Sequence, residues 1–218
     1  LVPALMVALA AGGALLQGCS VNPATGEQSF TGFMSPERER QIGAEEHPKL
    51  VKAFGGKYQD PALTRYLNGL GDLLQSTSEQ PKPPFTFTLL DTPVINAFAL
   101  PGGYIVLNSG LLLRADNASE VLGVLAHEIS HVTEQHGVRQ IMARAGVALT
   151  AQALLGDVNG MMAMIAAATP MLLSQSYSRD FESDADEHGF DLLEKADIDP
   201  NGLVSFFEKI MEEEKARL

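Results

Sequence analysis

Two histidines and a glutamate lie close together in the middle of the chain. His127, Glu128 and His131 form the pattern HExxH, within a segment whose apolar residues are spaced for one buried helical face. Four residues turn an α-helix by about 400°, so the two imidazoles lie one turn apart on the same face. Two imidazoles at this spacing can bind one Zn²⁺, and Glu128 can reach a water on the metal. The pattern therefore predicts part of a catalytic zinc site.

A catalytic zinc needs a third protein ligand and one open position. Downstream, Glu182 and Asp186 are again four residues apart and share one face of a predicted helix. Glu182 can ligate the metal, and Asp186 can accept the outer N–H of a ligating imidazole and fix its tautomer. Alone, these residues also fit a solvated acidic helix face with Asp184, Glu187 and Asp191. Together with HExxH, they predict that Glu182 is the third ligand and that Asp186 orients one of the ligating imidazoles.

Other polar residues near this site have structural alternatives. Tyr177, Arg179 and His188 flank the third ligand in sequence, and each has the chemistry to stabilise an oxyanion. The alternatives are a packed aromatic ring for Tyr177, a salt bridge for Arg179 and a surface position for His188. His136 follows His127 by nine residues, which is half a turn out of phase if the helix continues. We therefore expect His136 to face elsewhere, as a cap or a structural histidine.

The elements that must position these residues are mostly helices. Ser35-Pro36-Glu37 begins a helix that stops at Gly55-Gly56, and Asp60-Pro61 begins a second one. The HExxH helix begins at Asn117 or Ser119. Strand-like patterns occupy residues 85–90, 97–100 and 104–107, and residues 108–113 are predicted to form a helical turn. This order predicts an α+β, mainly helical domain over residues 35–218, with a small β-sheet beside the HExxH helix.

The combined motifs resemble a known family. His127-Glu128-Ile129-Ser130-His131 with His136-Gly137, then Ser178-Arg179 and Glu182-Ser183-Asp184-Ala185-Asp186, resemble the gluzincin metallopeptidases of the HtpX and CAAX prenyl protease family. The segment Asn96 to Tyr104 also resembles the family's sequence ahead of the zinc helix. Within the family, the chain is most similar to the periplasmic lipoprotein branch that includes BepA and LoiP. The resemblance covers about residues 35–218 and implies a zincin-type metallopeptidase domain there. Such relatives often continue past the position of Leu218.

The resemblance implies a full set of site residues. These are one Zn²⁺ per chain on His127, His131 and Glu182, a general base at Glu128 and a supporting Asp186. It also implies that a substrate strand adds to the sheet edge formed by Ala97, Phe98, Ala99 and Leu100. The implied function is a zinc metalloendopeptidase that cleaves unfolded, misfolded or misassembled envelope proteins. The alternative is an envelope chaperone or assembly factor whose zinc site is silent or gated.

The N-terminus predicts the compartment. Residues 1–18 are uncharged and apolar enough for the core of a signal peptide. Leu16-Gln17-Gly18-Cys19 resembles a bacterial lipobox, which implies cleavage before Cys19 and a lipid anchor on it. Ser20 favours the outer membrane, and residues 19–34 are predicted to be a tether on the periplasmic side. Because residue 1 is not Met and no basic segment precedes the apolar run, we expect the natural chain to begin earlier.

Composition limits the classes of partner. The 218 residues are 45% hydrophobic and 19% charged, with a net charge of −12, so we expect no binding to nucleic acid. The single cysteine excludes an internal disulfide. Between Ala145 and Ser178 only Asp157 is charged, and the segment is rich in Met. It is predicted to be a packed core helix, or alternatively a mobile flap or a surface for apolar client segments.

Overall fold

The computed structural model describes residues 20–21, 28–29, 35–78, 85–143, 159–160, 163–164, 167–168 and 177–216. The predicted signal peptide, Cys19, and most of the tether and of the Met-rich segment lie outside the described residues. Within the tether, strand β1 (Ser20–Val21) pairs antiparallel with β2 (Gln28–Ser29). None of the described helices is both long enough and apolar enough to cross a bilayer.

A three-stranded sheet forms the centre of the domain. Strands β3 (Thr86–Leu90), β4 (Ala97–Leu100) and β5 (Tyr104–Asn108) lie in the order β3-β5-β4. β4 and β5 form the predicted antiparallel pair, whose turn contains Gly102 and Gly103 at positive φ. β3 pairs with β5 in parallel, which the sequence did not indicate. β4 is consequently the outer strand beside the site.

Polar caps begin four of the helices, at the predicted Ser35 and Asp60, at Asn117 of the two predicted alternatives, and at Ser178, which was not predicted. The side chains of Ser35, Asp60, Asn117 and Ser178 each accept a backbone N–H of the following first turn. Gly55 and Gly56, both at positive φ, follow the end of the first of these helices. The helices with described bounds are α2 (Pro36–Ala53), α3 (Pro61–Thr77), α4 (Ser109–Arg114), α5 (Ala118–Thr133), α8 (Arg179–Lys195) and α9 (Asn201–Ala216), and residues 136–143 are helical as well.

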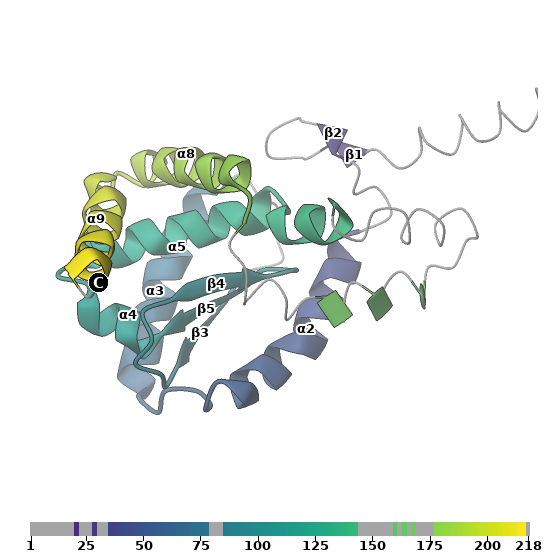
Figure 1. Ribbon diagram of the computed structural model, residues 1–218, viewed down its shortest axis with the longest axis horizontal. Coiled ribbons are helices and arrows are strands. Elements are labelled where there is room, and N and C mark those ends of the chain that lie inside the picture. The colour runs from purple at the N-terminus through teal and green to yellow at the C-terminus, as the bar shows by residue number, and fades with distance from the viewer. Residues whose placement is uncertain are drawn as a thin grey trace, which may run out of the picture.

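Helix α5 is the central element of the packing. It contacts β4 and β5 on one side and α8 and α9 on another, so it lies between the sheet and α8 (Figure 1). Its buried Leu125, Ala126 and Ile129 belong to one apolar core with residues of β5 and α8. A Cβ on Gly189 of α8 would lie 3.1 Å from the backbone nitrogen of His127, so the glycine permits the close approach of the two helices. The predicted α+β, mainly helical fold is confirmed.

Candidate metal centre

The two predicted ligand pairs meet where α5 packs against α8. His127 and His131 are buried on α5, and their Nε2 atoms are 3.0 Å apart. Glu182, in the first turn of α8, places Oε2 3.5 Å from Nε2 of His127. One donor atom from each of these three residues lies within 4.8 Å of the other two. The fold therefore brings together, from two distant segments, three side chains that could hold a metal ion.

The donor set suits one zinc ion. Zinc prefers imidazole nitrogen and carboxylate oxygen at about 2.0–2.1 Å in a tetrahedron, whose donor-to-donor edge is then about 3.3 Å. The distances from Nε2 of His127 to Nε2 of His131, 3.0 Å, and to Oε2 of Glu182, 3.5 Å, lie just below and just above that edge length. Three protein donors also leave one tetrahedral position open, which is the arrangement of catalytic rather than structural zinc sites. Both the chemistry of the donors and their spacing therefore fit the ion.

Asp186 lies on the outer side of His127. Its Oδ1 accepts a hydrogen bond from Nδ1–H of His127 at 2.9 Å, which leaves Nε2 turned toward the other donors. Burial opposes a charge on His127, but hydrogen bonds to Asp186 and Glu182 and the charge of Glu128 raise its pKa to about 10. Burial, together with the charge on His127, lowers the pKa of His131 to about 2. Without metal, Nε2–H of His127 therefore donates to Nε2 of the neutral His131.

Glu128 follows the first ligand and is buried between α5 and the sheet edge. Burial raises the pKa of Glu128 to about 7, and the charge of Glu182 adds to the rise. The charge on His127 and a hydrogen bond from the backbone of Ala99 oppose it. A carboxylate that titrates near neutral pH can both accept and return a proton, as a general base must.

The structure separates the three oxyanion candidates. The ring of Tyr177 stacks on that of His131, with centroids 4.0 Å apart, and burial, assisted by the nearby acidic charges, raises the pKa of its hydroxyl. Arg179 is exposed in the first turn of α8. Nδ1–H of His188 donates to the backbone carbonyl of Asp184, one turn earlier in the same helix, at 2.8 Å. Of the three, the structure places Tyr177 against a proposed metal ligand.

His136 does not face away from the site, so that prediction is wrong. Helix α5 ends at Thr133, and Gln135 adopts a positive φ of 55°, so the helical phase is lost before His136. The turn brings Nδ1 of His136 to 2.9 Å from Nδ1 of His131. Sequence reasoning also missed Phe207 of α9, whose ring packs edge-on against His127 at 5.6 Å. The contact of Phe207 depends on how α9 packs back against α5, and the contact of His136 depends on a turn that neither Glu134 nor Gln135 signals in the sequence.

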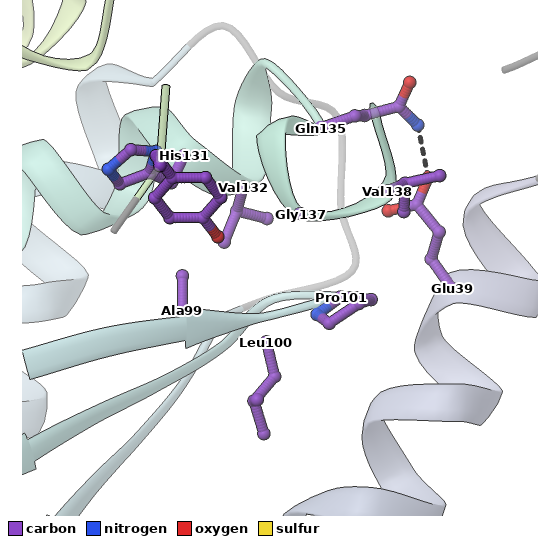
Figure 2. Close-up of a pocket in the computed structure, with 10 residues that line it drawn as sticks. Glu39, Ala99, Leu100, Pro101, His131, Val132, Gln135, Gly137 and Val138 are labelled. Carbon is purple, nitrogen blue, oxygen red and sulfur yellow. Dashed lines mark hydrogen bonds between the residues drawn. The ribbon is translucent and has the colours of Figure 1, made fainter. Parts of the chain in front are cut away.

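A small hollow of about 10 Å³, with room for about one water molecule, lies beside the proposed ligand His131, between the end of β4 and the end of α5. His131 is at one end of it, and a hydrogen bond from Gln135 to the buried Glu39 of α2 is at the other (Figure 2). Figure 2 shows Ala99 pointing from β4 toward the helix side, whereas Leu100 points to the opposite side of the strand. The floor and walls are mostly apolar.

Comparison with known proteins agrees with this geometry. The sequence model of peptidase family M48 matches residues 61–215. The chain is 35% identical over 190 residues to the beta-barrel assembly-enhancing protease of Escherichia coli K12, which covers 83% of this chain and 39% of that protein. It is 29% identical over 160 residues to the metalloprotease LoiP of the same organism, which covers 71% of this chain and 60% of LoiP. The chain thus spans about two-fifths of the length of the first relative. From the extent of the family match, the chain belongs to peptidase family M48.

Proposed function

We propose that the protein is a zinc-dependent endopeptidase that cleaves misfolded or misassembled proteins of the bacterial envelope. The observation that carries the proposal is the convergence of His127, His131 and Glu182, with the buried carboxyl of Glu128 beside them. Membership of a metallopeptidase family implies a bound metal. The substrate class is proposed from the relatives named for beta-barrel assembly.

Each side chain of the centre has a separate task in this proposal. His127, His131 and Glu182 hold the zinc, and Asp186 keeps Nε2 of His127 directed at it. A bound Zn²⁺ would polarise the scissile carbonyl and bring the pKa of a bound water toward about 7. Glu128 takes the proton of the attacking water and then delivers it to the leaving amine. Tyr177 is the favoured donor to the developing oxyanion, since its ring lies against His131.

The substrate lies along β4 in this proposal. β4, which consists of Ala97, Phe98, Ala99 and Leu100, is an outer strand of the sheet and contacts the helix that carries Glu128. An extended segment that adds to this edge would pass the metal centre with its main chain held in register. A side chain next to the scissile bond would then lie over the small hollow between Pro101 and His131. This placement favours unfolded chains, because a folded protein rarely offers a free extended segment.

The location of the protein is proposed from its N-terminal motif. Cleavage after residue 18 and a lipid on Cys19 would tether the domain by residues 19–34 to the periplasmic face of the outer membrane. The envelope is where misassembled β-barrel proteins occur, so the proposed anchor and the proposed substrates belong to one compartment. A lipid-labelling experiment on the wild type and on Cys19→Ala tests the anchor without reference to peptidase activity.

The central experiment combines metal analysis with cleavage of casein and of an unfolded outer-membrane β-barrel protein. Glu128→Gln should retain one zinc per chain and lose at least about 100-fold in cleavage rate, because only the proton carrier is removed. A chelator should abolish the wild-type rate, and added zinc should restore it. Glu187→Gln, an exposed change on α8, is the matched control and should cleave normally. Undiminished cleavage by Glu128→Gln would refute the peptidase mechanism, and aggregation suppression without cleavage in the wild type would favour a chaperone.

A further inference from the structure

We propose that His136 is a positioning residue of the metal centre, which accepts the Nδ1 proton of His131 and so directs Nε2 of that ligand at the metal. The inference rests on the proposed zinc site and adds a partner for the second imidazole. Asp186 has this task for His127. No carboxylate of the described residues is hydrogen-bonded to Nδ1 of His131, where the partner is instead a second imidazole.

The geometry places His136 behind the ligand rather than among the ligands. Its Nδ1 is 2.9 Å from Nδ1 of His131, whereas the donors that face one another on the metal side are Nε2 of His127, Nε2 of His131 and a carboxylate oxygen of Glu182. The side chain of His136 is completely buried, with 0% of its surface exposed. Its ring stacks on Phe181 of α8, at 4.5 Å between centroids and 19° between planes. Two helices therefore hold this imidazole in one orientation.

The position of each proton follows from the hydrogen-bond geometry. A neutral imidazole that ligates metal through Nε2 carries its proton on Nδ1. Nδ1–H of His131 must then donate to Nδ1 of His136, which has to be an unprotonated acceptor. The proton of the neutral His136 is consequently on Nε2. Only this tautomer of His136 is compatible with ligation by His131.

An acid lies near the far side of His136, where this tautomer carries its proton. Its Nε2 is buried and has no hydrogen-bond partner among the described residues. The closest acid is Asp184 of α8, whose Oδ2 is 3.8 Å away and whose side chain is 46% exposed. A small rotation of this carboxylate would bring it within reach of Nε2–H. Asp186 thus supports His127 directly, and Asp184, two residues earlier on α8, is the acid nearest to Nε2 of His136.

The test measures zinc affinity by competition with a chromogenic chelator. His136→Phe keeps a stacked ring but removes the acceptor, and its zinc dissociation constant should rise about 10–100-fold. His136→Asn restores an acceptor oxygen at the position of Nδ1 and should recover most of that loss. His47→Phe is the matched control, because His47 is also a buried histidine with one side-chain partner, the hydroxyl of Thr88 at 2.9 Å, but lies on α2. It should bind zinc like the wild type.

The outcomes separate this inference from the proposed function. Failure of the wild type to bind zinc would overturn the metal site itself. Wild-type affinity in a folded His136→Phe would overturn only the role of His136. If His136→Phe does not fold, ¹⁵N–¹H spectra of the zinc-loaded wild type decide, since they report the tautomer of each histidine. A proton on Nε2 of His136 and on Nδ1 of His131 is expected, and a proton on Nδ1 of His136 would refute the proposal.

Discussion

Replacement of Glu39 by Gln tests whether a buried carboxyl beside the proposed substrate hollow makes the fold sensitive to pH. Glu39 is on α2 and is 5% exposed. It accepts hydrogen bonds from the side chain of Gln135 and from the backbone of Gly102. Glutamine keeps an acceptor oxygen for these donors but has no proton to lose. The change therefore removes the ionisation and leaves the shape of the side chain nearly unaltered.

The magnitude follows from the shift of one titration. Burial raises the pKa of Glu39 from 4.5 to about 8, and its two hydrogen bonds only partly oppose the rise. The folded protein therefore keeps a proton that the unfolded chain loses, and stability falls as the pH rises. The stabilisation that the protonated Glu39 gives the folded state is fully present below pH 4.5 and is lost as the pH rises through about 8. At about 1.4 kcal/mol per pH unit, the loss between pH 5 and pH 8 is on the order of 4 kcal/mol.

The assay is urea denaturation of the metal-free protein at pH 5, 6, 7 and 8. The difference in unfolding free energy between the wild type and Glu39→Gln isolates this carboxyl, because every other titrating group is common to both. We expect the variant to gain stability relative to the wild type as the pH rises. Glu45→Gln, an exposed change on the same helix, should give a profile parallel to that of the wild type. Parallel profiles for Glu39→Gln would refute the buried-carboxyl reasoning.

Three further changes test the helices around the metal centre. Asp186→Asn should weaken zinc binding about 10–100-fold, since its oxygen orients His127, and unchanged affinity in chelator competition would exclude that role. Gly189→Ala should also weaken zinc binding while preserving the circular dichroism spectrum, because its Cβ presses on the backbone of α5; wild-type affinity would contradict this. Lys209→Met should cost about 2 kcal/mol in urea denaturation, because the buried Glu120 loses an ion pair of 2.7 Å, and wild-type stability would show that the pair contributes little.

Much of the local structure could be predicted because its signals lie within a few residues. Caps, prolines and glycines mark the ends of α2, and spacing of four residues relates the members of each polar pair on α5 and α8. The structure brings both pairs together as the sequence suggested, although their catalytic roles stay proposals. The parallel pairing of β3 with β5 could not be predicted, because it joins segments whose relative placement depends on the core as a whole.

The misplacement of His136 shows where periodicity alone fails. A helix that continued through Glu134 and Gln135 would carry His136 half a turn away from His127, and neither residue is a glycine or proline that would signal a stop. A non-glycine residue in the left-handed region costs on the order of 1 kcal/mol. Here the hydrogen bond from the side chain of Gln135 to Glu39 of α2 opposes that cost and holds the turn.

The carboxyl of Glu39 and the imidazole of His136 are therefore linked through a single turn of the chain. Glu39 holds the side chain of Gln135, Gln135 supplies the positive φ that ends the helix, and the next residue is the histidine behind His131. If this dependence holds, Glu39→Ala should weaken zinc binding although Glu39 contacts no proposed ligand, whereas Glu39→Gln, which still accepts from Gln135, should preserve it. Equal zinc affinities for the two variants would show that the turn keeps its conformation without this contact to α2, and that α5 and α8 suffice to place His136.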